Sequence, residues 1–366
     1  MNLHFKKWFA GLTAGVMLLS SASCGMLEMR GTETESEAEE TTPLMLAPAQ
    51  RTNELETRAE TEPPVLEEPA ASVTFCLTGD IRIDESIIHD AANRAPEGKS
   101  YGFIRMYTGV FRSVSCADIA LGSYSAADIP CGSDGSRKTP VESLAALSDI
   151  GFDVLDTSYT GNDSAEMESY DIADIAVDEE IRYLEQNGIT TAYVSLAVSD
   201  TDKVEAASEN ADMVIVSFSW KQDTDSTEQK KIASALAQAG ADVIVGDGLT
   251  LGSVEWIDTG DGTPTLAAYS LGSLLTTSDN PYALCGGILE FTAEETDDGV
   301  IVKNPVLSPT VVRYTKGGSD YQLILLSDYK EALSSDHAVA GTSAEALISF
   351  VRDTVTTEFL SPALRG

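Results

Sequence analysis

The stretch from residue 213 to residue 246 constrains the fold most strongly, because two β-branched runs flank an amphipathic segment. Met213–Ser217 and Val243–Gly246 are short apolar runs of the kind that form buried strands. Ser226–Ala239 carries apolar residues on one face at helical spacing, and Gly240 follows it as a stop signal. This order predicts a βαβ unit, in which the two strands are parallel and the crossover is right-handed.

Strand and helix signals also alternate before this unit. We expect strands at Val73–Leu77, Ala117–Gly122, Val154–Leu155 and Thr191–Val194, and helices at Tyr101–Val114, Val141–Ile150 and Ile175–Gln186. The first strand should deliver Asp80 to a loop at its C-terminal end. Asn187 and Gly188 should stop the last of these helices.

After Ser253 the signals are mostly those of strands, and the chain closes with a helix at Ser343–Val355. The expected strands are Val254–Ile257, Leu266–Leu271, Gly287–Thr292, Val300–Val306, Val311–Tyr314 and Gln322–Leu326. Because no helices separate them, we expect antiparallel pairing in this part. The whole pattern predicts a layered α/β sandwich with mixed sheets, helices outside and a site at the C-terminal ends of strands.

The first 24 residues have the pattern of an export signal. Two lysines precede an apolar run from Trp8 to Leu19, which is too short to span a membrane comfortably. The run ends in Ser21–Cys24, which is similar to the bacterial lipobox, although an aliphatic residue is usual in place of Ser21. We expect lipidation of Cys24 and anchoring outside the cytoplasm. The alternative is a plain secretory signal, which would release the protein.

Residues 25–71 have the composition of a disordered tether. Glutamates alternate with Thr and Ser, prolines follow, and aromatic residues are absent. Such a stretch cannot bury enough apolar area to offset its ordering entropy, and like charges keep it extended. The remaining residues, 72–366, are enough for one large domain, so we expect three parts: signal, tether and domain.

The formal net charge of −36 argues against nucleic acid and anionic lipid as partners, and it disfavours the binding of anionic wall polymers unless a divalent cation bridges the two. Nucleic acid and anionic lipid surfaces would be repelled, so the only membrane contact we expect is the lipid anchor. Four cysteines remain beyond Cys24, namely Cys76, Cys116, Cys131 and Cys285, and they allow three pairings. Buried free thiols and a disulfide are both open, and Cys116 with Cys131 is the first pair to test.

Six motifs occur in an order that is typical of one family. They are Gly79-Asp80, Cys116–Leu121, Ile150–Leu155, Ala211–Trp220, Ala239–Gly246 and Tyr269–Ser273, with Gly286–Glu290 behind them. Their order and spacing resemble the CapA/PgsA family of capsule and poly-γ-glutamate synthesis proteins over nearly all of the stretch from Val73 to about Tyr329. The resemblance implies a calcineurin-like metallophosphatase fold and a role in capsule or another extracellular polymer.

The chain departs from the family at most of the metal-site motifs. Ser123-Tyr124-Ser125 replaces Asn-Leu-Glu, Tyr159-Thr160-Gly161 replaces Asn-Asn-His, Ser219-Trp220-Lys221 replaces His-Trp-Gly, Gly246–Thr250 replaces Gly-His-His-Pro-His, and Ser270–Ser273 replaces Ser-Leu-Gly-Asn. Of the metal positions only Asp80 is clearly kept. Beyond the signal peptide the chain has only His89 and His337, and neither stands at a motif position. A histidine-rich dimetal site is therefore not expected.

Several residues remain candidates for chemistry in the cleft that the resemblance implies. Hard cations such as Ca²⁺ or Mg²⁺ accept all-oxygen sites, and loop carboxylates are plentiful here. Trp220, with Phe218 beside it, could stack on a sugar ring. The catalytic candidates are Asp80, Asp223 and Asp247; the ligand-binding candidates are Asp80, Thr160, Ser219, Trp220, Asp247 and Thr250; the candidate ligands for Ca²⁺ or Mg²⁺ are Asp80 and Asp247.

Three functions fit these features. The leading hypothesis is a non-catalytic CapA-like surface lipoprotein that takes part in the synthesis, binding or retention of an extracellular polymer. A second is a metal-dependent hydrolase of phosphoesters or amides with a remodelled carboxylate site. A third is a surface scaffold that docks other assembly proteins.

Overall fold

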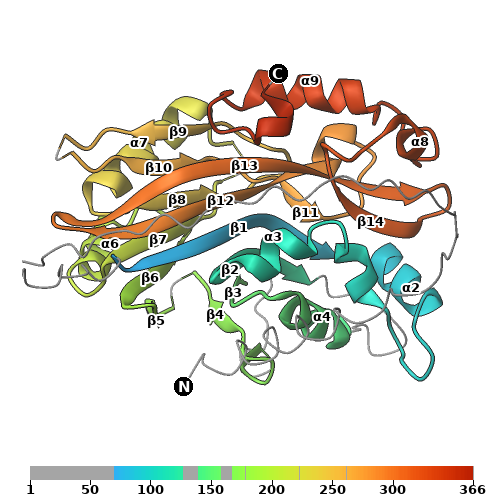
Figure 1. Cartoon of the computed structure of the whole chain (residues 1–366), viewed down its shortest axis with the longest axis horizontal. Coiled ribbons are helices and arrows are strands. Elements are labelled where there is room, and N and C mark those ends of the chain that lie inside the picture. The colour runs from blue at the N-terminus through green and yellow to red at the C-terminus, as the bar shows by residue number, and fades with distance from the viewer. Residues whose placement is uncertain are drawn as a thin grey trace, which may run out of the picture. The chain divides into compact units, whose positions relative to one another are not determined.

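Two β-sheets pack face to face, and helices cover their outer faces (Figure 1). The computed structural model describes residues 70–365, apart from residues 127–138, 158–166, 178, 222 and 261. The described residues fall within one compact unit, Leu66–Gly366. The expected signal peptide and nearly all of the expected tether lie outside them. The predicted layered α/β sandwich is confirmed.

Among the described residues, the first sheet has eight strands: seven in the order β14-β13-β12-β1-β2-β3-β4, and β11, which also pairs with β1. Strands β1 to β4 are parallel to one another, whereas β12, β13 and β14 are joined to β1 as an antiparallel meander. The bounds are β1 Ser72–Ile83, β2 Ile119–Ala126, β3 Val154–Asp156, β4 Ala173–Ile175, β11 Ser273–Leu275, β12 Cys285–Thr296, β13 Gly299–Thr315 and β14 Ser319–Leu325.

The second sheet, as far as the structure describes the chain, has six strands in the order β5-β6-β7-β8-β10-β9. Its centre is parallel and includes the predicted βαβ unit, in which β7 pairs with β8. Antiparallel strands close both edges. The bounds are β5 Arg182–Gln186, β6 Ile189–Leu196, β7 Met213–Phe218, β8 Val243–Gly246, β9 Val254–Ile257 and β10 Thr265–Ala268.

The helices are amphipathic or short, and several begin at a carboxylate. Asp84 accepts hydrogen bonds from the first-turn N–H groups of α2, and Asp225 does the same for α7, because helix N-termini leave donors unpaired. The helices are α2 Glu85–Asn93, α3 Phe111–Cys116, α4 Glu142–Ile150, α6 Thr201–Ser208, α7 Ser226–Gln238, α8 Glu331–Ser334 and α9 Ala344–Thr354, with 3₁₀ turns η2 Phe103–Tyr107, η3 Pro281–Leu284 and η4 Pro362–Leu364.

Alternation along the strands builds three apolar clusters. In β1, Val73, Phe75 and Leu77 join the cluster between the sheets, while Cys76 joins the cluster beneath α2, η2, α3 and α4. A third cluster lies between the second sheet and helices α6 and α7. Because successive strand residues point to opposite faces, each sheet is buried on both sides.

One predicted helix is wrong. Ile175–Gln186 contains the end of β4 and all of β5, and β5 forms an antiparallel hairpin with β6. Asn187 and Gly188 have φ values of 53° and 86°, so they make the tight turn between these strands. An Asn-Gly pair with positive φ at both residues suits a two-residue hairpin turn, whose twist matches that of the strands. The helix stop expected at this pair is therefore a hairpin turn.

Other boundaries differ from the sequence expectations. The stretch Tyr101–Val114 is not one helix but the turn η2 followed by α3. Strand β1 continues past Leu77 to Ile83, so Asp80 lies inside a strand and not in a loop after it. The strands expected at Val300–Val306 and Val311–Tyr314 are one long strand, β13, and α6, β4 and β11 were not predicted.

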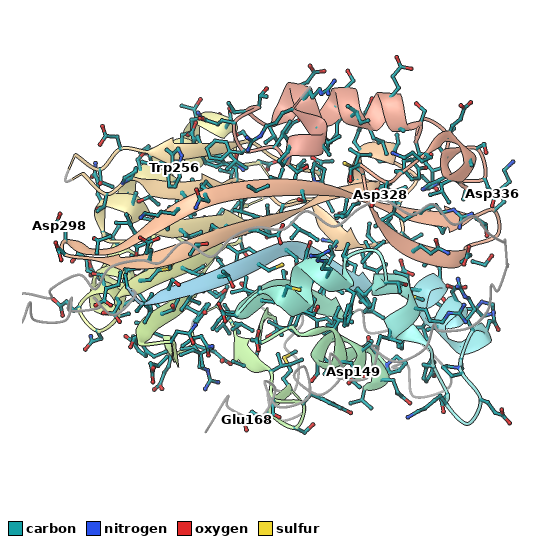
Figure 2. All side chains as sticks on the ribbon, in the orientation of Figure 1. Asp149, Glu168, Trp256, Asp298, Asp328 and Asp336 are labelled. Atoms are coloured by element: carbon teal, nitrogen blue, oxygen red, sulfur yellow. The ribbon has the colours of Figure 1, made fainter. Side chains whose placement is uncertain are left out.

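Several acidic side chains of the described residues lie on the surface. Figure 2 shows Asp149, Glu168, Asp298 and Asp336 directed outward from the ribbon, and all four are exposed. The cysteines in the described part of the chain are free thiols: Cys76 and Cys285 are buried, and Cys116 is exposed. Cys131 lies outside the described residues. No helix among the described residues is long and apolar enough to cross a membrane.

Candidate functional site

A small cavity lies where both sheets end, between β1 to β3 on one side and β7 and β8 on the other. Its volume is about 20 Å³, which is room for about one water molecule or ion. Its lining is largely polar and consists of Thr78, Gly79, Asp80, Leu121, Ser123, Asp156, Ser217, Ser219, Val245, Gly246, Asp247 and Gly272. Parallel strands bring their C-terminal ends to one edge, which is why the fold places these residues together.

Asp80 lines this cavity and is 5% exposed. Its Oδ2 atom is 2.5 Å from Nε of Arg82, and its Oδ1 atom accepts hydrogen bonds from the hydroxyls of Ser125 at 2.8 Å and Ser123 at 3.4 Å. The pKa of Asp80 is raised by burial, while the Arg82 charge and the two hydroxyls act in the opposite direction. The Asp80 carboxylate is therefore already paired with the Arg82 guanidinium and hydrogen-bonded to two serine hydroxyls.

Asp247 follows β8 and faces the same cavity. Its Oδ1 atom accepts a hydrogen bond from the backbone N–H of Trp220 at 3.0 Å. The pKa of Asp247 is raised to about 6, chiefly by burial; the charges of Asp80 and Asp156 also raise it, whereas the Trp220 N–H and the Arg82 charge lower it. This carboxyl group is therefore partly protonated near neutral pH.

Asp156 is a third carboxylate of the cavity, and the sequence analysis missed it. It ends β3, is 3% exposed and accepts a hydrogen bond from the hydroxyl of Ser195 at 3.0 Å. The signal was present, because Val154-Leu155-Asp156 places an acid directly after a short apolar run. Arg82 was missed as well, since the expected end of β1 at Leu77 left its side chain unplaced.

Two glycines of the cavity wall, Gly79 and Gly246, lie so close to neighbouring groups that a larger residue would not fit. A Cβ atom on Gly79 would lie 2.1 Å from the carbonyl oxygen of Gly272, and one on Gly246 would lie 2.1 Å from Nε1 of Trp220. The Trp220 ring packs on Phe218 at 4.4 Å between centroids and donates its N–H to the carbonyl of Tyr269 at 2.8 Å. Trp220 is therefore anchored at the edge of the core, and sugar stacking by Trp220 stays a prediction.

The structure gathers only part of the predicted set. Asp80, Ser219 and Asp247 line the cavity, and Trp220 lies next to it. Asp223 is exposed and does not line it, and Thr250 uses its carbonyl to accept from Ser270. Thr160 and Cys24 lie outside the described residues.

The donor set does not fit the two-metal centre that the resemblance implies. No group of three or more His, Cys, Asp or Glu side chains in the described ranges is arranged to hold a metal ion. His89 contacts Asn93 on α2, and His337 is buried against the Val312 carbonyl. Without imidazoles, and with Arg82 on Asp80, the cavity lacks the nitrogen ligands that transition metals favour.

Comparison with known proteins links the chain to capsule synthesis. Residues 171–278 match the family model described as bacterial capsule synthesis protein PGA_cap. This match confirms the predicted relationship to the CapA type of capsule synthesis protein and supports a function related to capsule synthesis. It covers all of the second sheet and includes Trp220 and Asp247.

The other comparisons add little. No curated protein matches the chain. Among solved structures, the crystal structure of a hypothetical protein from Thermus thermophilus is 12% identical, with a TM-score of 0.42, and the match covers 64% of this chain and 99% of that one.

Proposed function

We propose that this chain binds or retains an extracellular polymer, either poly-γ-glutamate or a polysaccharide, during capsule synthesis and does not hydrolyse it. The PGA_cap match supports the process. The observation that carries the non-catalytic role is the ion pair between Arg82 and Asp80, with 2.5 Å between Nε and Oδ2. A guanidinium stays protonated and has no open coordination position, so it cannot generate a hydroxide as a bound metal does.

The proposed place of action is outside the cytoplasm, with the chain attached to the membrane through Cys24. The pattern of residues 1–24 supports this proposal, and so does the acidic stretch that follows. The proposed partners are the polymer itself and other surface-assembly proteins.

The second candidate function is hydrolysis with a remodelled carboxylate site. It is favoured by the convergence of Asp80, Asp156 and Asp247 on one cavity. A carboxyl group whose pKa is near 6, as at Asp247, is also suited to general acid–base work. Ca²⁺ or Mg²⁺ would be the fitting cation, because the donors are oxygen atoms.

Metal content and turnover separate the two functions. The purified protein is expected to hold no transition metal by elemental analysis and to show no phosphodiesterase activity with added Mn²⁺. Arg82→Ala should free Asp80 and strengthen Ca²⁺ or Mg²⁺ binding in calorimetry, whereas Asp149→Ala, on an exposed face of α4, should leave it unchanged. Two tightly held metals per chain, or turnover that Asp80→Ala abolishes, would establish the hydrolase.

A further inference from the structure

Strand β5 forms an open edge of the second sheet. It stands first in the strand order of that sheet and pairs with β6, and no described strand covers its other side (Figure 1). In the part of the chain that the structure describes, the backbone groups of residues 182–186 have no backbone partner outside this hairpin. Arg182, Tyr183 and Glu185 are exposed. An edge of this kind is a template on which another strand can pair.

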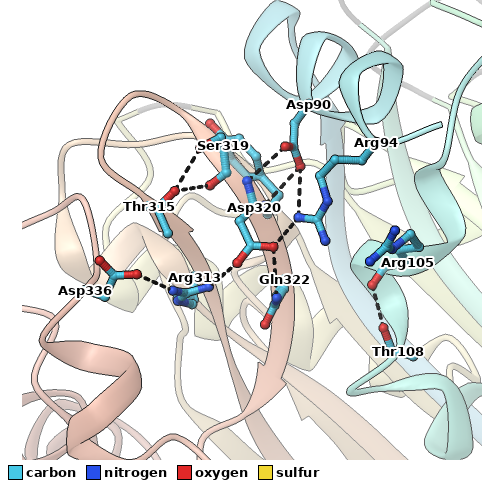
Figure 3. Close-up of polar contacts among 11 residues, drawn as sticks. Asp90, Arg94, Arg105, Thr108, Arg313, Thr315, Ser319, Asp320, Gln322 and Asp336 are labelled. Atoms are coloured by element: carbon cyan, nitrogen blue, oxygen red, sulfur yellow. Dashed lines mark hydrogen bonds and ion pairs between the residues drawn. The ribbon is translucent and has the colours of Figure 1, made fainter.

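The first sheet shows how an edge of this protein is protected. At β14, the Asp90 carboxylate accepts the backbone N–H groups of Asp320 and Tyr321 at 2.9 Å and 3.0 Å (Figure 3). Edge strands are also blunted by lysine, by proline or by a bulge. Strand β5 has none of these, because its sequence is RYLEQ and its pairing with β6 runs in one unbroken register. Its two charges, Arg182 and Glu185, have opposite signs, so they do not prevent pairing with a second β5 strand.

The hairpin geometry shows which backbone groups of β5 point away from β6. A two-residue turn is flanked by a pair that exchanges both hydrogen bonds, here Gln186 and its partner on β6, and such pairs alternate along the ladder. The other strand agrees, because the Thr190 carbonyl of β6 points toward β7 and accepts the N–H of Asp212. The N–H and carbonyl groups of Tyr183 and Glu185 are therefore the ones directed at the open side.

Two copies of β5 are complementary in an antiparallel pairing centred on Leu184. In this register Tyr183 of each copy lies opposite Glu185 of the other, so the outward backbone groups of both residues meet their partners. Opposed residues share a face of the sheet, which places a tyrosine hydroxyl beside a carboxylate. The Oε1 atom of Glu185 accepts the Gly188 N–H at 3.2 Å, and Oε2 has no partner among the described residues. This oxygen is available to the Tyr183 hydroxyl of the second copy.

We propose that β5 is a contact surface for a second copy of this chain, and that the two copies form one continuous sheet about a twofold axis at Leu184. In this register Arg182 lies opposite the uncharged Gln186, and no like charges are opposed. A pairing centred on Glu185 would place two carboxylates opposite each other, which is unfavourable. The net charge of −36 repels the copies at long range, so salt should strengthen the dimer. This inference is independent of the proposed polymer binding.

Sedimentation velocity of the Cys24→Ala chain, which cannot be lipidated, measures the association. We expect twice the chain mass to appear as the concentration approaches roughly 100 µM, because a contact limited to an edge strand is weak. Tyr183→Glu places a carboxylate opposite Glu185 at two symmetric positions and should weaken association about tenfold, whereas Tyr183→Lys should preserve it. Val198→Glu and Val198→Lys make the same charge changes at a position that is 57% exposed after β6, and both should associate like the parent chain.

A cross-link tests the register. Opposed residues of a pair without mutual hydrogen bonds lie about 4.5 Å apart at Cα, a separation that a disulfide spans. In a background that keeps only the two buried cysteines, Leu184→Cys should join two copies under mild oxidation. Glu185→Cys should not, because that position lies opposite Tyr183.

Three results would overturn the proposal. They are a monomer at every concentration, equal association of Tyr183→Glu and Tyr183→Lys, and a cross-link at Glu185→Cys but not at Leu184→Cys. A monomer throughout would show that the edge stays open or accepts a strand of another protein. Unchanged circular dichroism and melting of each variant would show that folding is intact.

Discussion

At the scale of single residues, the main feature of the site is the pairing of Asp80 with Arg82. A buried carboxylate needs a partner, and Arg82 supplies one from two positions further along the same strand. Residues two apart on a strand lie on the same face, so the continuation of β1 past Asp80 places Arg82 beside it, in a stretch where the register of β1 with its neighbours shifts. The Arg82 side chain is 43% exposed and the Asp80 side chain 5%, so the ion pair joins a buried carboxylate to a partly exposed guanidinium.

The raised pKa of Asp247 predicts a pH-dependent stability. The folded value is about 6 and the ordinary value is 3.8, so the folded state binds more protons between these values. Stability therefore falls as pH rises through this window, and the ionised carboxylate is unfavourable above it. Asp247→Asn keeps an oxygen for the Trp220 N–H and removes the charge. It should raise the free energy of unfolding by about 2 kcal/mol near pH 7.5 and change it little near pH 4.

Urea unfolding at these two pH values measures the effect. Asp149→Asn, at an exposed position on α4, is the matched control and should show no such difference between the two pH values. A loss of stability in Asp247→Asn near pH 7.5 would show that the ionised carboxylate is favourable in the cavity, as a bound cation would make it.

At the scale of elements, a charged network ties α2 to the last strand of the first sheet. Asp90 of α2 accepts the backbone N–H groups of Asp320 at 2.9 Å and Tyr321 at 3.0 Å, and it is 1% exposed. Arg313 continues the network to Asp320 and Asp336 (Figure 3). The contacts of Asp90 also satisfy N–H groups of the edge strand β14, which would otherwise be open to pairing with another chain.

Burial decides how much each acid of this network contributes. Asp90→Asn turns one accepting oxygen into a donor that faces a backbone N–H, so we expect a loss of about 2 kcal/mol in the free energy of unfolding. Asp336→Asn removes an acid whose side chain is 63% exposed, and its loss should stay below about 1 kcal/mol. Chemical denaturation of both variants gives the comparison. Equal losses would mean that the network acts through its charges and not through the buried backbone contacts.

At the scale of the whole molecule, the cavity depends on both sheets. The PGA_cap match covers the second sheet, which supplies Asp247, whereas Asp80 and Asp156 come from the first. The proposed attachment outside the cytoplasm rests on the sequence pattern of the first 24 residues.

The anchor can be tested in cells. Cys24→Ala removes the thiol that would carry the lipid, so the protein should move from the membrane fraction to the medium, because the attached acyl chains hold such a protein at the membrane. Immunoblots of both fractions measure the change. Cys116→Ala, which alters an exposed cysteine of the domain, should stay with the membrane. Membrane retention of Cys24→Ala would contradict lipidation.

Local patterns determined much of this protein. The βαβ unit at 213–246, the helix stop at Gly151 with its φ of 109°, and the antiparallel meander near the C-terminus follow from periodicity and turn chemistry. These features depend on neighbours in sequence, so the sequence alone predicts them. The sequence also predicts a chain reversal at Asn187-Gly188. An Asn-Gly pair can end a helix or join two strands, and here the pairing of β5 with β6 makes it a hairpin turn.

The composition of the cavity was decided by tertiary structure. Asp80, Asp156 and Asp247 are separated by 76 and 91 positions, and only the meeting of the two sheets brings them together. Whether Asp80 faces a metal or an arginine depends on how far β1 continues and where it bulges, which its pairing with β2 and β11 sets. Strand periodicity fixes which face a residue takes, whereas a partner across a cavity depends on register between segments distant in sequence.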